Sequence, residues 1–144
     1  MPTDELTDLA VQLRLLVGRL NRRIRIDDGH RSLPPLQLSA LATVEQHAPL
    51  RLTELARREA VTPPTMSRVL AALHDQSLVV CVPDPQDGRG KLITISAAGS
   101  SRLRTVRSTR TALVARRLRR LDDEQCRTLS AALPALTALL VDDG

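Results

Sequence analysis

The sequence predicts a mainly α-helical fold that contains one small β-hairpin. Two observations lead to this fold class. Along most of the 144 residues, apolar side chains recur at spacings of three and four, which is the pattern of an amphipathic helix. Residues 78–96 depart from it, because a β-branched run and an alternating run flank a segment rich in turn-forming residues. We therefore expect helices on both sides of a single hairpin.

The first predicted element is a long amphipathic helix over residues 5–27. Its arginines lie largely off the apolar stripe, and Asp27-Asp28-Gly29 ends the pattern. The stripe consists of Leu6, Leu9, Ala10, Leu13, Leu16, Val17, Leu20 and Ile24. Such a stripe needs another apolar surface to cover it.

The second predicted helix begins around Leu33-Pro34-Pro35, because proline is tolerated in a first helical turn, and it runs to Pro49. A short helix follows. Thr53 is a suitable N-cap for it, since a threonine hydroxyl can accept from a free backbone N–H. Its buried side is expected to consist of Leu55, Ala56 and Ala60.

A further helix is expected after Thr62, which serves as its N-cap, with Pro63 in the first helical position. Its core-facing residues are Met66, Val69, Leu70 and Leu73. Two short helices joined by a tight connection form a helix-turn-helix, so the later helix is the candidate recognition helix.

A hairpin is expected next. The run LVVCV is β-branched, PDPQDGRG supplies an eight-residue tip, and KLITIS alternates apolar with polar residues. The element order over residues 33–96 is therefore that of a winged helix-turn-helix. Such a module can place its recognition helix in the major groove of DNA and its hairpin tip over phosphates or in the minor groove.

Two further helices are predicted after the hairpin. Ala97-Ala98-Gly99 leads into a second long helix, and Asp122-Asp123-Glu124 opens a last one, since acidic residues suit a positive helix N-terminus. Pro134 predicts a kink or break in that last helix. Apolar positions of the two helices are Leu103, Val106, Leu113, Val114, Leu118, Leu121, Cys126, Leu129, Leu133, Leu136, Leu139 and Leu140.

The chain is thus expected to have three parts. Residues 33–96 form the DNA-binding core, while residues 1–32 and 97–144 supply dimerisation helices. A core of about 60 residues covers the long apolar stripes only partly, so pairing with a second copy is an economical way to bury them. The predicted dimerisation residues are Leu6, Leu9, Leu13, Leu16, Leu129, Leu133, Leu136 and Leu140. A two-fold dimer would present its recognition helices about 34 Å apart, one turn of DNA.

Composition narrows the kind of nucleic acid. A net charge of +5 favours an anionic partner, although many basic proteins bind no anionic partner specifically. The chain has no Phe, Trp or Tyr, whereas readers of single strands usually stack bases on aromatic rings. Duplex DNA can be read without such rings, so we expect a double-stranded operator as the partner.

The predicted DNA contacts lie at the start of the recognition helix and in the tip. Arg68 can pair bidentately with a guanine edge, and Arg89 can enter a narrow minor groove while Asp87 orients its guanidinium. Two glycines permit the tip to turn tightly and to approach phosphates. The full set is Thr53, Pro64, Thr65, Ser67, Arg68, Asp87, Arg89 and Lys91. The competing interpretation is a solvated helix face and an ordinary β-turn.

Residues 50–99 resemble the DNA-binding core of the MarR family of bacterial transcriptional regulators, with the run LRLTELARREAVTPPTMSRVLAALHDQSLVVCVPDPQDGRGKLITISAAG. The most specific part is Asp87-x-Arg89 followed by Leu92, Ile93, Ile95, Ser96 and Gly99. The flanking helices are similar to the family's dimerisation elements. Two departures, Val80-Cys81 and Gly88, remove polar or basic residues common in the family and imply fewer wing–phosphate contacts.

The resemblance implies a homodimeric regulator, expected to be a repressor, on a pseudo-palindromic operator. Its recognition helices would enter successive major grooves, and Arg89 would reach the flanking minor groove. It also implies a small anionic or phenolic ligand between the DNA-binding and dimerisation regions. A nonspecific architectural DNA-binding protein and a protein-interaction module remain as alternatives.

Other chemistry is not expected. Cys81 and Cys126 are interpreted as inert core residues of a protein in reduced cytoplasm, and no targeting or membrane-spanning segment is expected. The three histidines lack metal-ligand spacing, so neither a metal nor a cofactor is predicted. The arginine run of residues 102–120 is interpreted as a solvated helix face. The sequence contains no recognisable catalytic motif, and an enzyme is not expected.

Overall fold

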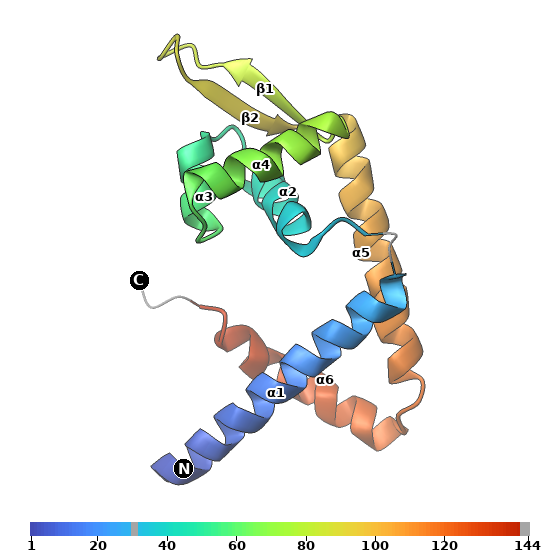
Figure 1. Cartoon of the computed structure of the whole chain (residues 1–144). Coiled ribbons are helices and arrows are strands. Elements are labelled where there is room, and N and C mark those ends of the chain that lie inside the picture. Colours follow the sequence, from blue (N-terminus) through green and yellow to red (C-terminus); the bar gives the residue numbers. More distant parts are fainter. Residues whose placement is uncertain (30–31, 142–144) are drawn as a thin grey trace. The chain divides into compact units, whose positions relative to one another are not determined.

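The computed structural model describes residues 1–29 and 32–141 and consists of helices and one two-stranded antiparallel hairpin (Figure 1). The predicted fold class is confirmed. The elements in chain order are α1 (Thr3–Asp28), α2 (Pro35–His47), α3 (Leu52–Arg58), α4 (Pro63–Asp75), β1 (Val79–Pro83), β2 (Lys91–Ile95), α5 (Ala97–Leu118) and α6 (Asp123–Ala138). His30, one of the three histidines considered above, lies outside the described residues.

The chain divides into two compact units. The winged unit comprises residues 28–109, and the helical unit comprises residues 1–27 and 110–144. The first half of α5 belongs to the winged unit, where Gly99, Leu103 and Val106 are buried. The compact unit therefore extends beyond residue 96, because the Leu103 and Val106 side chains are part of its core.

The core of the winged unit contains no aromatic side chain. Helices α2, α3 and α4 pack against one another, and the hairpin closes the core over them. Its most deeply buried large side chains are Leu41, Leu50, Leu55, Met66, Leu73 and Leu103. All four predicted core residues of α4 are buried, and so are Leu55 and Ala56 of α3. Ala60 was predicted wrongly: α3 ends at Arg58, and Ala60 is exposed in the left-handed region with a φ of 53°.

The helix starts also differ in detail from the predictions. Thr53 is not the N-cap of α3, because Arg51 occupies that position with extended backbone and Thr53 lies inside the first turn. Thr62 is the N-cap residue of α4, and Pro63 follows as predicted. The Thr62 side chain makes no capping bond, because its hydroxyl lies 3.1 Å from that of Thr65.

The hairpin, called the wing below, pairs Val79 with Ile95 at one end and Pro83 with Lys91 at the other. The tip between the strands is therefore residues 84–90, one residue shorter than predicted, because Pro83 takes part in the ladder. An isolated bridge joins Leu50, just before α3, to Ile93 in the middle of β2. This bridge fastens the wing to the helix-turn-helix.

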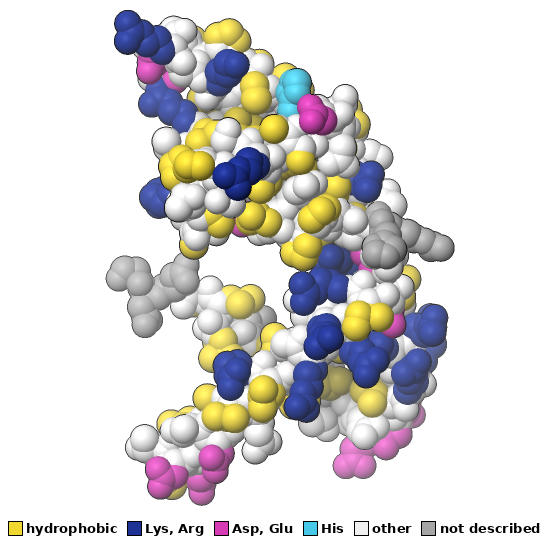
Figure 2. All heavy atoms as spheres, in the orientation of Figure 1, with side chains coloured by type: hydrophobic (Ala, Val, Ile, Leu, Met, Phe, Trp, Pro, Cys, Tyr) yellow, Lys and Arg dark blue, Asp and Glu magenta, His cyan; other side chains and the backbone are white. Residues whose placement is uncertain are grey.

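The helical unit leaves many of its apolar side chains exposed. None of the residues of α6 is buried, and α1 buries only Asp28. Of the eight predicted dimerisation leucines, Leu13 is half-buried and the other seven are exposed, reaching 63% at Leu16 and 81% at Leu140. Figure 2 shows hydrophobic side chains at the surface among Lys and Arg side chains, with acidic side chains at the N-terminal end of α1.

The start of α6 confirms the predicted acidic opening. Asp122 is its N-cap, and a capping box forms because the Asp122 carboxylate accepts from the Gln125 N–H at 2.8 Å while the Gln125 side chain accepts from the Asp122 N–H at 3.1 Å. Pro134 does not break α6, which continues to Ala138. Within residues 1–29 and 32–141, no helix combines the length and apolar character needed to span a bilayer.

Candidate nucleic-acid interface

The outward face of α4 is the first part of the candidate interface. Because Met66, Val69, Leu70 and Leu73 point into the core, the helix leaves Pro64, Ser67 and Arg68 exposed at its N-terminal half. Thr65 is half-buried, and its hydroxyl is held by that of Thr62. Thr53 is exposed on the first turn of α3. These positions leave the predicted side chains free to meet a ligand, and their contact with DNA stays a prediction.

A groove runs between α4 and the wing. It has a volume of about 350 Å³ and is lined by Leu52, Ser67, Leu70, Ala71, His74, Asp75, Cys81, Lys91 and Ile93. Ser67 of the recognition helix and Lys91 of β2 thus open onto one concave surface. Two of the predicted DNA-binding residues, 24 positions apart in the chain, are brought together by the fold.

The groove also corrects the interpretation of Cys81. This cysteine is exposed, not part of the core, because only Val79 of β1 faces inward. Cys126 of α6 is half-buried, and its thiol donates to the Leu118 carbonyl oxygen at 3.7 Å. The β-branched sequence around Cys81 predicted a strand correctly but did not reveal which face of that strand is covered.

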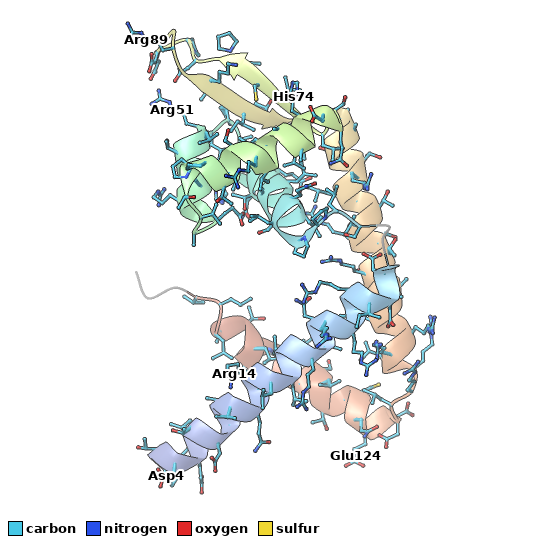
Figure 3. The ribbon with its side chains drawn as sticks, in the orientation of Figure 1. Asp4, Arg14, Arg51, His74, Arg89 and Glu124 are labelled. Carbon is cyan, nitrogen blue, oxygen red and sulfur yellow. The ribbon has the colours of Figure 1, made fainter. Side chains whose placement is uncertain are left out.

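The tip carries Arg89 at the far end of the wing, with Asp87 two residues before it (Figure 3). The predicted bond between Asp87 and the Arg89 guanidinium does not form. The Asp87 carboxylate instead accepts from the Arg89 backbone N–H at 3.1 Å, a local turn that aspartate makes with the residue two positions on. Asp87 therefore shapes the tip and leaves the guanidinium of Arg89 unpaired among the described residues.

An ion pair that the sequence analysis missed holds the other end of the tip. The Arg51 Nε donates to Asp84 Oδ2 at 3.0 Å, and its Nη2 donates to the same oxygen. The Asp84 side chain is only 5% exposed, whereas that of Arg51 is 52% exposed. The Gln86 N–H, donating at 2.9 Å, and then Arg51 lower the pKa of Asp84, and the same pairing raises the pKa of Arg51. No spacing rule links these residues, which lie 33 positions apart.

Several arginines elsewhere are neutralised within the chain. Arg58 pairs with Glu54 at 3.2 Å, Arg107 with Glu45 at 2.8 Å and Arg117 with Asp27 at 2.6 Å. Arg68 and Arg89 make no ion pair with any residue that the structure describes. Their charges are therefore uncompensated by the described residues on α4 and at the tip of the wing, which suits an interface with a polyanion.

Comparison with known proteins agrees with this geometry. A sequence model described as the MarR family matches residues 33–91. The chain is 36% identical over 132 residues to an uncharacterised HTH-type transcriptional regulator of Mycobacterium bovis, covering 92% of each chain.

Two solved structures share the fold. One is a MarR family protein from Bacillus stearothermophilus, with a TM-score of 0.79 and 20% identity, for which 99% of each chain is covered. The other is a variant of Staphylococcus aureus MepR bound to an oligodeoxyribonucleotide, with a TM-score of 0.69 and 19% identity, which covers 92% of this chain and 98% of that one. The winged helix-turn-helix, the family model and the mycobacterial relative lead to one conclusion: this chain belongs to the MarR family of transcriptional regulators.

Proposed function

We propose that this regulator binds a pseudo-palindromic duplex operator as a cytoplasmic homodimer and represses transcription there. The proposal rests on two arginines of one unit that form no ion pair with a described residue. Arg68 lies on the outward face of α4, and Arg89 lies at the tip of the wing. A helix fits the major groove, and an arginine on a thin hairpin fits the minor groove. One unit can thus read two neighbouring grooves.

The roles within this interface follow from the side chains. Arg68 reads a guanine, Ser67 and Thr65 bond bases or phosphate oxygens, and Arg89 enters the minor groove. Lys91 and Thr53 meet phosphates, while Pro64 packs against the backbone of the DNA. The groove that joins Ser67 to Lys91 supports this assignment, because a continuous surface can follow the edge of a duplex.

The helical unit supports a dimer. Its exposed leucines on α6 recur at the spacing of one helix face, with Leu129 at 45%, Leu133 at 58% and Leu136 at 37% exposure. A second copy carries the same apolar face, and a two-fold interface is self-complementary. Two recognition helices then reach successive major grooves, so the operator has two half-sites.

A small anionic or phenolic ligand is proposed to release the operator. A pocket of about 440 Å³ on α1 is lined by Arg19, Arg22, Arg23 and Ile26, which combines positive charge with an apolar contact. Both features suit an aromatic carboxylate. Calorimetric titration with salicylate tests this: binding that Arg22→Ala abolishes is expected, and equal binding by both proteins would remove the pocket from the proposal.

The experiment that tests DNA binding is a gel-shift titration with the duplex upstream of the protein's own gene, at two salt concentrations. We expect tighter binding to that duplex than to random DNA of equal length. Equal affinity for both would favour a nonspecific architectural protein, because backbone contacts carry no sequence information. No binding to either would favour a protein-interaction module.

A further inference from the structure

Two neighbouring residues just before α3, Leu50 and Arg51, form hydrogen bonds with the wing. Leu50 exchanges two backbone hydrogen bonds with Ile93 of β2, at 3.2 and 2.8 Å. The next residue, Arg51, reaches with its side chain to Asp84 at the start of the tip. The Leu50–Ile93 bridge holds the middle of the wing, and the Arg51–Asp84 pair holds the tip that carries Arg89.

Asp84 is the centre of the hydrogen bonds that shape the tip. Its Oδ1 accepts from the Gln86 N–H at 2.9 Å, and its own backbone N–H donates to the Gly90 carbonyl oxygen at 2.9 Å. Gly90 in turn donates to the Asp87 carbonyl oxygen at 2.9 Å, and Asp87 accepts from the Arg89 N–H. A continuous path of hydrogen bonds therefore leads from the Arg51 side chain to the backbone of Arg89.

This path of hydrogen bonds depends on the ion pair, because Asp84 is buried whereas Arg51 is exposed. Asp84 is 5% exposed, and a carboxylate taken from water is costly unless hydrogen bonds and an opposite charge compensate it. Arg51 supplies two donors to a single oxygen, Oδ2. Without Arg51, the buried carboxylate would regain water by opening the tip.

We propose that Arg51 and Asp84 are positioning residues, which fix the tip so that Arg89 points toward DNA. This inference rests on the proposed function, in which Arg89 enters the minor groove. Figure 3 shows Arg89 at the end of the wing and Arg51 on the same side of the winged unit. The pair acts through Arg89, so its contribution to affinity exists only while Arg89 is present.

A double-mutant cycle tests this dependence. Affinities for the upstream duplex are measured for the full-length protein and for Asp84→Asn, Arg89→Ala and the double variant. Asp84→Asn is expected to weaken binding about tenfold in the wild-type background and less than about twofold when Arg89 is absent, because residues that act as a unit are not additive. Arg51→Gln gives a second cycle from the exposed partner, and its direct loss of charge cancels within that cycle.

Glu45→Gln is the matched control. It breaks the Arg107–Glu45 pair, another carboxylate–arginine pair of the same unit, joining α2 to α5. Its effect on affinity is expected to be the same with and without Arg89. Equal losses from Asp84→Asn in both backgrounds would overturn the positioning role, since the pair would then only stabilise the fold.

A measurement on the free protein separates this inference from the proposed function. Amide hydrogen exchange at Gln86, Arg89 and Gly90 is expected to accelerate at least about tenfold in Asp84→Asn and Arg51→Gln, while exchange at Leu50 and Ile93 stays unchanged. Unchanged exchange in the tip would overturn the inference. If the wild type shows no preference for the upstream duplex, the proposed function fails, and exchange still decides whether the pair orders the tip.

Discussion

Gly99 lies against the backbone of Leu78 so closely that a Cβ atom at residue 99 would overlap the Leu78 carbonyl oxygen. The same atom would come within 2.7 Å of Ile95 Cγ1. Gly99 is the first buried residue of α5, and Leu78 lies directly before β1. This contact explains in physical terms why a glycine belongs in the signature that ends the wing.

Replacing Gly99 with alanine is expected to lower the free energy of unfolding by about 2 kcal/mol or more, because the added methyl group meets backbone and cannot be accommodated by a rotamer change. Chemical denaturation followed by circular dichroism measures the change. Gly88→Ala is the control, since a Cβ there meets nothing within 4 Å. Similar stability of the two variants would contradict the close packing of α5 against Leu78 and Ile95.

Arg89→Ala is expected to weaken operator binding and to reduce the slope of log affinity against log salt by about one unit, because one cationic contact with DNA is lost. Fluorescence anisotropy with labelled DNA, repeated over a series of salt concentrations, gives the slope. Arg104→Ala removes the same charge from an exposed position of α5 in the same unit and serves as the control. An unchanged slope for Arg89→Ala would remove the wing arginine from the interface.

Arg68→Ala is expected to reduce the preference for the operator over random duplex by about 1–3 kcal/mol, the value of one bidentate base contact. Competition titrations measure the preference directly. The loss should fall mainly on specific binding, unlike that of Arg89→Ala. A variant that discriminates as well as the wild type would show that Arg68 only solvates its helix.

The leucines of α6 give a prediction on assembly. Leu133→Glu is expected to shift the protein from dimer to monomer at micromolar concentration, because it replaces an apolar contact by a charge at the centre of the exposed stripe. Sedimentation velocity measures the shift. Ala131→Glu, at an exposed position on the opposite face of α6, is the control. A wild type that sediments as a monomer would contradict the proposed dimer.

The pH dependence of stability follows from Asp84. Its pKa in the folded protein lies below the ordinary value of 3.8, so folding favours the ionised carboxylate. This contribution is complete well above pH 3.8 and disappears as the pH falls through the lowered pKa. The difference in unfolding free energy between wild type and Asp84→Asn should therefore be constant near neutrality and shrink in acid. A difference that grows on acidification would have the wrong sign.

Features that depend on the periodicity of apolar residues could be predicted from the sequence. The stripe of Met66, Val69, Leu70 and Leu73 predicted both the buried face of α4 and, by elimination, the outward position of Arg68. The acidic start of α6 at Asp122 was also predicted by a local rule, since acidic side chains are favoured at a positive helix N-terminus.

Features that depend on contacts between residues far apart in the sequence could not be predicted in this way. The pairing of Arg51 with Asp84 and the exposure of Cys81 follow from how the wing docks on the helices. Local rules also misplaced the cap of α3, because Thr53 matches the preferred residue type while the backbone turns at Arg51. Propensity gives the kind of terminus, and tertiary packing decides its position.

The absence of aromatic residues has a consequence for spectroscopy. With no Phe, Trp or Tyr anywhere in the sequence, the protein has no aromatic side chain to absorb near 280 nm or to fluoresce. Its folding can therefore be followed by the circular dichroism of the backbone, but not by aromatic absorbance or fluorescence. A single tryptophan introduced at Val82, which is 39% exposed on β1, would be the sole emitter of the whole chain. Its emission would then report the wing alone, without interference from the rest of the molecule.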